Sequence, residues 1–179
     1  MRWLRQFIVC VPVLLAITSS GQKRPEKQQT FRSPDGALVA IVTSQTRPQA
    51  TAESRIEIRK SSGKVLASQS YTSDSGEHGY GIAKAQWTPN SRFFVFSLES
   101  SGGHSAWHSP VLFFSVERNE VFSLDDALRD AVMNPQFKIT APDKVTVELY
   151  FTRKTGTVSL STVRNVNLSP GPVPGELQH

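Results

Sequence analysis

The chain has 179 residues, 38% of them hydrophobic, and its 20 basic and 15 acidic residues give a net charge of +5. Residues 1–21 hold two of the basic residues and no acidic one, so residues 22–179 contain 18 basic and 15 acidic residues, a net charge of +3. These residues lack the concentrated basic stripe that a nucleic-acid partner requires. The single cysteine, Cys10, also lies in this segment, so residues 22–179 offer no disulfide, thiolate metal ligand or cysteine nucleophile.

The first 21 residues have the pattern of an export signal. Arg2 and Arg5 precede an apolar run over residues 7–17, and small residues follow at 18–21. About 11 apolar residues fall short of the roughly 20 that cross a bilayer as a helix. We therefore expect a signal peptide over residues 1–21, a periplasmic or secreted protein, and no transmembrane span after cleavage. An uncleaved N-terminal anchor is the alternative.

The two ends of the remaining chain differ in composition from its middle. Residues 22–29 are polar and charged, which predicts a flexible lead-in, and residues 169–179 are rich in proline and glycine, which predicts a disordered tail. Between them, residues 30–168 are expected to form a single β-rich domain.

Nearly every periodic segment of that domain has the period of two that is typical of strands. Residues 55–59 alternate strictly, and residues 65–68 return as the second strand of a hairpin. Residues 92–98 carry bulky side chains on both faces, which predicts a strand covered on both sides. Residues 110–124 predict a hairpin with Arg118 and Asn119 at its tip. Residues 145–151 predict a strand with Phe151 on its apolar face, and residues 157–163 return beside it.

One segment, residues 124–133, has a helical period. Ser123 is a candidate N-cap, with Asp126 at the third helical position, and an apolar stripe falls at Leu124, Ala127, Leu128, Ala131 and Val132. Asn134 and Pro135 are expected to end the helix. Asp125 and Asp126 lie in its first turn, where acidic residues favour the helix dipole, so we interpret them as structural.

A turn motif occurs three times. "SPDG" at 33–36, "TPNS" at 88–91 and "APDK" at 141–144 each place a proline before Asp or Asn and ahead of a strand. The prolines at 34, 89 and 142 are separated by 55 and 53 residues, a spacing that suits a four-stranded β unit.

These turns and the strands after them resemble the WD40-like repeats of TolB-type β-propellers, in which such a turn leads into the innermost strand of each blade. The resemblance implies blade-like sheets and little about chemistry. Closed propellers generally have four to eight blades, and three units are present here. We expect an all-β, mainly antiparallel fold with one short helix and propeller-blade-like sheets in a compact non-propeller or sandwich arrangement. The alternative is a small or oligomer-completed β-propeller.

Two loops, residues 71–80 and 99–109, are expected to emerge at the end of the sheet opposite the turn at Pro89. They carry three of the four histidines, and we predict a ligand-binding surface at Tyr80, His104, Trp107 and His108, for a protein, peptide or glycan. In a competing interpretation, Tyr80 and Trp107 only close the end of the core.

The same loops allow a second hypothesis, a metal site formed by His78, His104 and His108. The His-x3-His spacing is strong evidence only on a helix, and the glycines at 102 and 103 argue against one. Ser105 lacks the setting of a nucleophile elbow, so no catalytic residue is predicted. The favoured function is an exported, non-enzymatic binding or scaffold domain without a cofactor. The alternatives are an enzyme that uses a divalent transition metal and a subunit of a propeller-like oligomer.

Overall fold

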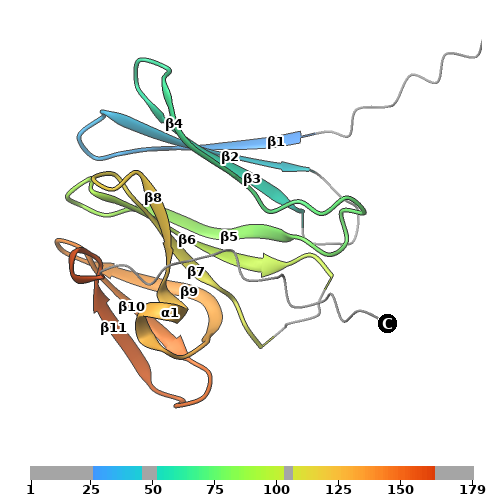
Figure 1. Ribbon diagram of the computed structural model, residues 1–179, viewed down its shortest axis with the longest axis vertical. Helices are drawn as coiled ribbons and strands as arrows, with labels where there is room; N and C mark the ends of the chain where they lie inside the picture. Colours follow the sequence, from blue (N-terminus) through green and yellow to red (C-terminus); the bar gives the residue numbers. More distant parts are fainter. Residues whose placement is uncertain (1–25, 46–51, 103–106, 164–179) are drawn as a thin grey trace, which may run out of the picture.

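The computed structural model describes residues 26–45, 52–102 and 107–163, which form three antiparallel sheets and one short helix. Each sheet is built from strands that are consecutive in the chain (Figure 1). Sheet 1 contains β1 (Glu26–Arg32), β2 (Leu38–Gln45), β3 (Ser54–Lys60) and β4 (Val65–Ser70). Sheet 2 contains β5 (Tyr80–Trp87), β6 (Phe93–Ser100), β7 (Val111–Ser115) and β8 (Glu120–Ser123). After α1 (Leu124–Leu128), sheet 3 contains β9 (Val132–Thr140), β10 (Lys144–Leu149) and β11 (Thr155–Ser159), followed by a 3-10 turn over Leu160–Thr162.

The sheets stack as three layers, with sheet 2 in the middle (Figure 1). One core lies between sheets 1 and 2, and it includes Ile56 and Ile58 of β3 with Phe94 and Phe96 of β6. The second core lies between sheets 2 and 3, and it includes Phe93 and Val95 of the same strand β6. Every residue of β6 from Phe93 to Leu98 is buried, which confirms that this strand is covered on both faces.

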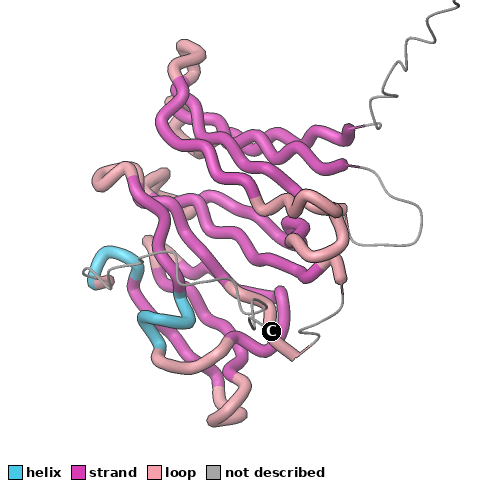
Figure 2. The backbone as a smooth tube through the Cα atoms, turned by 45° about the vertical axis from the view of Figure 1, so that its right-hand side comes forward, coloured by secondary structure: helices cyan, strands magenta, loops and turns pink. Residues whose placement is uncertain are grey.

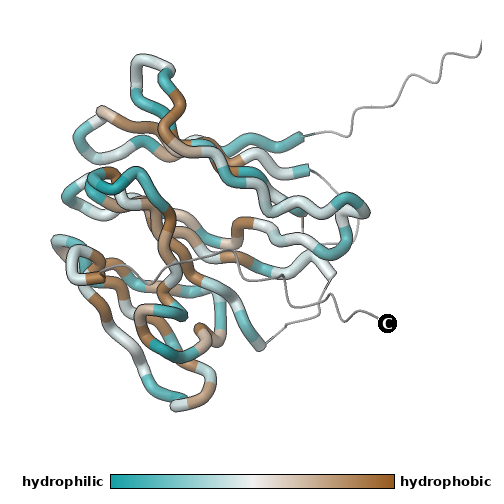
Figure 3. Tube along the Cα trace, in the orientation of Figure 1, coloured by the Kyte–Doolittle hydropathy of each residue, from teal (hydrophilic) through white to brown (hydrophobic). Residues whose placement is uncertain are grey.

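In the two outer layers, buried residues alternate with more exposed ones along β3 and β10, and Figure 3 shows hydrophobic and hydrophilic segments mixed within these layers. On β3, Ile56 and Ile58 point to the core while Arg55, Glu57 and Arg59 point away from it. The three sheets remain separate layers and do not close into a barrel (Figure 2). The predicted fold class, mainly antiparallel β-structure with one short helix, is confirmed.

Two of the three repeated turns share one hydrogen-bond pattern. Ser33 Oγ accepts from Leu38 N at 2.9 Å and donates to Asp35 Oδ1 at 2.6 Å. Thr88 Oγ1 accepts from Phe93 N at 3.1 Å and donates to Asn90 Oδ1 at 2.7 Å. The third turn has Ala141 in the corresponding place and cannot form these bonds.

All three turns lie at one end of the stack (left in Figure 1), and each joins the first strand of its sheet to the second. The first two turns also contact each other, because Asp35 N donates to Ser91 Oγ at 3.0 Å. Beside them, Trp87 Nε1 donates to Phe31 O at 2.9 Å, so the ends of sheets 1 and 2 are hydrogen-bonded together.

The predicted end of the helix and the predicted extent of the lead-in need correction. The helix predicted over 124–133 ends at Leu128, because Arg129 adopts the left-handed conformation and Asp130 turns its carboxylate to the amides of Phe151 and Thr152. Val132 therefore begins β9, an edge strand that tolerates Pro135. Strand β1 includes residues 26–29, assigned above to the lead-in, because pairing with β2 supplies the backbone hydrogen bonds that this polar segment lacks alone.

Candidate binding surface

The two loops predicted to meet do lie at the same end of sheet 2. Tyr80, at the start of β5, pairs with Ser100, at the end of β6, and Ser101 N donates to Gly79 O at 2.9 Å. The loop that carries His78 therefore lies against the start of the loop that leads to Trp107.

A buried carboxylate that the sequence analysis did not identify holds these loops together. Glu53 is 1% exposed, and its Oε1 accepts hydrogen bonds from Ser73 Oγ, Gly79 N and Ser101 Oγ, each at 2.8 Å. Its Oε2 accepts from Ser73 N at 2.8 Å. We call these four hydrogen bonds the Glu53 network.

Burial acts to raise the pKa of Glu53, but the hydrogen bonds of the network together outweigh it and hold the pKa below its ordinary value. A carboxylate that already accepts four hydrogen bonds at this end of the sheet has a structural role. Gly79 is part of it, since a Cβ there would lie 2.3 Å from Tyr71 O and 2.7 Å from Glu53 Cδ.

Beyond the undescribed residues 103–106, the second loop approaches sheet 3. His108 Nε2 lies 3.0 Å from Asp125 Oδ1, and the same oxygen accepts from Val132 N at 2.7 Å. Because a carboxylate oxygen accepts, the Nε2 nitrogen of His108 carries the proton and donates it. Asp125 thus ties the loop to the first residue of β9, as well as lying in the first turn of α1.

Trp107 packs against an aromatic residue that follows β10. Its ring centroid lies 4.7 Å from that of Tyr150 and 5.4 Å from that of His108. Tyr150 in turn lies 5.2 Å from Phe151 at an interplanar angle of 84°, and the Arg153 guanidinium lies 4.7 Å from the Tyr150 ring centroid. We name these five residues the Trp107–Phe151 patch.

The turn after β10 directs Phe151 outward. Asp130 accepts hydrogen bonds from Phe151 N at 3.0 Å, Thr152 N at 3.1 Å and Thr152 Oγ1 at 2.8 Å. These bonds end the strand at Leu149, so Phe151 does not continue the apolar face of β10 as the alternation predicted. It is 71% exposed, and Trp107 is 45% exposed.

The sequence-predicted site residues therefore occupy different places. Tyr80 begins β5 and packs on the core between sheets 1 and 2, whereas Trp107 and His108 contact Tyr150 and Asp125 beside sheet 3. His78 lies in the other loop, where its backbone N donates to Ser73 Oγ at 3.1 Å. His104 lies outside the described residues, so the binding and metal hypotheses that include it remain predictions. Across residues 26–45, 52–102 and 107–163, no three His, Cys, Asp or Glu side chains are grouped as metal ligands.

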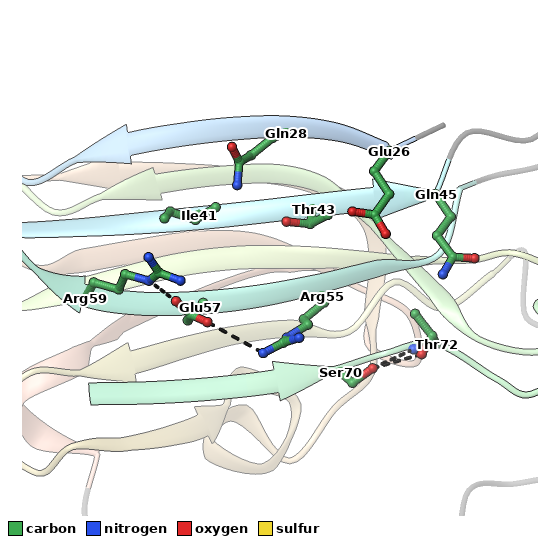
Figure 4. Close-up of a pocket in the computed structure, with 10 residues that line it drawn as sticks. All are labelled: Glu26, Gln28, Ile41, Thr43, Gln45, Arg55, Glu57, Arg59, Ser70 and Thr72. Atoms are coloured by element: carbon green, nitrogen blue, oxygen red, sulfur yellow. Dashed lines mark hydrogen bonds and ion pairs between the residues drawn. The ribbon is translucent and has the colours of Figure 1, made fainter. Parts of the chain in front are cut away.

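A hollow of about 410 Å³ lies on the outer face of sheet 1 (Figure 4). Its centre is a row along β3 in which Glu57 pairs with Arg55 and with Arg59. The other lining residues are polar apart from one isoleucine: Glu26, Gln28, Ile41, Thr43, Gln45, Ser70 and Thr72. The three charged side chains of this row already form ion pairs with one another, so the aromatic patch is the stronger candidate for binding.

The signal segment at residues 1–21 and the tail at 169–179 also lie outside the described residues. Within the part of the chain that the structure describes, no helix has the length and hydropathy to cross a membrane. No protein-family model and no curated protein matches the chain.

Proposed function

We propose that this chain is an exported, non-enzymatic binding domain that uses TolB-like repeat units as a scaffold and the Trp107–Phe151 patch as its binding surface. One observation carries the proposal. Among the described residues, the exposed large hydrophobic side chains are Val65, Trp107 and Phe151, and two of these three lie in one ring cluster. Grouped apolar exposure marks an interaction site, whereas scattered exposure is ordinary.

The composition and rigidity of the patch support binding. Tryptophan, tyrosine and arginine are the residues most enriched among those that dominate binding energy at interfaces. The patch is fixed from both sides, because Asp125 holds His108 and Asp130 holds the turn that carries Phe151. A surface ordered before binding loses less conformational freedom when a partner docks.

The two alternative functions have weaker support. The metal-dependent enzyme depends on His104, for which no position is described. The oligomer-completed propeller requires another subunit to cover an outer sheet face, and those faces carry charged and hydroxyl side chains. On sheet 1 they include Arg55 and Glu57, and on sheet 3 Thr146 and Glu148.

The test screens the full chain, produced with its N-terminal segment, against a random peptide display library and a glycan array. We expect patch-dependent binding, which a Trp107→Ala/Phe151→Ala double variant loses. The matched control is Val65→Ala, which removes a similarly exposed apolar side chain from sheet 1 and should bind as the wild type does. Binding that survives the double variant, or no binding to either library, would contradict the proposed surface. Intact-mass analysis of the exported chain tests cleavage of the first 21 residues.

A further inference from the structure

Strand β1 differs from the other sheet edges in having a long and unbroken free edge. Each described sheet has two edge strands, which are β1 and β4, β5 and β8, and β9 and β11. An edge strand presents unpaired backbone groups to which another chain can add a strand. Proteins protect such edges with bulges, proline, short strands or side chains that bond to the free backbone groups, so the edges of this fold can be compared one by one.

Five of these edges carry one of those protections. β5 is bulged between Ile82 and Lys84, and β9 contains Pro135. β8 and β11 have four and five residues. β4 is bulged at Leu66, whose carbonyl oxygen accepts a hydrogen bond from Asn119 Nδ2 at 3.3 Å. In β1, by contrast, all seven residues pair with β2 in one uninterrupted register.

Alternate residues of β1 present their backbone groups to the free edge. Ser33 N donates to Leu38 O at 3.0 Å, and continuing this ladder along the register bonds the odd-numbered residues of β1 to β2. The N–H and C=O groups of the even-numbered residues therefore point away from β2: Glu26, Gln28, Thr30 and Arg32. Every residue of β1 except Phe31 is exposed, so the edge is accessible.

The side chains of β1 complement a second copy of the same strand. When two copies pair antiparallel about Gln29, the even-numbered residues face one another, with Glu26 opposite Arg32 and Gln28 opposite Thr30. Such a register matches each free N–H with a C=O of the other copy and uses the whole strand. Within the described residues, neither Glu26 nor Arg32 forms an ion pair, so both charges are available to a partner.

Other registers lose this complementarity. A shift by two residues leaves Glu26 or Arg32 without its counterpart, and parallel pairing in register sets like charges side by side. Opposite charges directly across two antiparallel strands stabilise the pairing, and like charges destabilise it. The charges at the two ends of β1 therefore favour one orientation and one register.

We infer that two copies of the chain pair through β1, antiparallel about Gln29, and join their first sheets into one continuous sheet. The two-fold pairing uses the β1 edge of both copies, so the assembly ends at the dimer. It extends sheet 1 sideways, which differs from closing a propeller. The inference goes beyond the proposed function, because the dimer contact includes no residue of the Trp107–Phe151 patch.

Sedimentation of the full chain over a concentration series tests the backbone pairing. We expect a monomer–dimer equilibrium without larger species. Gln28→Pro removes an N–H from the free edge and keeps the hydrogen bonds of the odd-numbered residues to β2, so it should abolish the dimer. Gln28→Ala is the matched control, because it keeps that N–H and should dimerise. Urea unfolding at a concentration where the wild type is monomeric should show that both variants fold.

Charge reversal tests the register. Glu26→Arg and Arg32→Glu should each raise the dissociation constant of the dimer on the order of tenfold, because like charges then meet at both ends of the paired strands. An equimolar mixture of these two variants should dimerise again, since opposite charges meet in the mixed pair. Lys138→Glu, at an exposed position of the edge strand β9, should dimerise as the wild type does.

The Trp107→Ala/Phe151→Ala variant should also dimerise, so failure of the proposed binding surface and failure of the dimer are distinguishable. A wild-type chain that stays monomeric over the whole series would overturn the inference, as would growth beyond the dimer. A dimer that survives Gln28→Pro uses another surface. Charge variants that dimerise as tightly as the wild type, or that stay monomeric when mixed, would overturn the register about Gln29.

Discussion

Replacing Glu53 by glutamine tests whether the Glu53 network stabilises the loop end of the protein. The substitution keeps the shape of the side chain and removes its charge. The new amide oxygen can keep the three donors now bound to Oε1. The new NH₂ group then faces Ser73 N–H, so two donors meet in a site where the side chain is 1% exposed.

The cost follows from these four contacts. A buried donor without an acceptor costs about 1–3 kcal/mol, and a hydrogen bond to a charged group is worth roughly twice one to a neutral group. One unsatisfied amide and three weakened bonds give a loss of about 3 kcal/mol in the free energy of unfolding for Glu53→Gln.

The pH dependence has a definite sign. The pKa of Glu53 is lower in the folded chain than its value of 4.5 in the unfolded one, so the unfolded chain takes up the proton first as pH falls. The stabilisation is therefore fully present above about pH 4.5, and it is lost as pH falls through the folded-state pKa. The difference between wild type and Glu53→Gln should be largest at neutral pH and shrink in acid.

Urea unfolding, followed by tryptophan fluorescence from pH 7 to pH 3, measures both effects. Glu117→Gln is the matched control, because it breaks an exposed ion pair with Arg92, with side chains 72% and 51% exposed, and should cost under about 1 kcal/mol. A Glu53→Gln variant within about 1 kcal/mol of wild type at pH 7, or a difference that does not change with pH, would refute this role for Glu53.

Two further predictions concern the core and the repeated turns, and both use urea unfolding. Phe96→Ala should lower the free energy of unfolding by about 3–5 kcal/mol, because that ring is completely buried between sheets 1 and 2. Phe151→Ala should lower it by under about 1 kcal/mol. Similar losses in the two variants would contradict the assignment of Phe151 to the surface. Thr88→Ala should cost about 1–2 kcal/mol because Phe93 N loses its hydroxyl acceptor, and Thr88→Ser, which keeps the hydroxyl, should recover much of the loss. Equal losses for the alanine and serine variants would show that the methyl group, not the hydroxyl, stabilises that turn.

The strands were predictable because their signals are local. Alternation along residues 55–59 and bulky side chains on both faces of residues 92–98 depend only on neighbours in the sequence, and both strands form as expected. The N-cap of α1 was also local, since Ser123 Oγ accepts from Asp126 N. The length of the helix could not be predicted locally, because Asp130 accepts a hydrogen bond from a turn more than twenty residues later in the chain.

The site was less predictable because its contacts, too, join residues that are far apart in the sequence. The donors to Glu53 lie 20, 26 and 48 residues beyond it, so nothing near Glu53 in the sequence identified them. Trp107 and His108 were selected from sequence because they are unusual side chains in a glycine-rich loop. Tyr150, the partner of Trp107, was not selected, because "ELYFT" continues the alternation of a strand and only the turn held by Asp130 takes it out of the sheet.

The polarity of the sheet faces limits whether this fold can lose a sheet or gain one. Among the sheets that the structure describes, sheet 2 alone packs both of its faces against a core, and the face toward sheet 1 carries Trp87, Phe94, Phe96 and Phe114. A truncation that removed sheet 1 would leave these rings in water, and the shortened chain would aggregate. A fourth layer added at either end would meet charged or hydroxyl side chains. Although its turns recur, the described chain is therefore not a modular array, because inner and outer units are not interchangeable and a duplicated unit would fit only between existing layers.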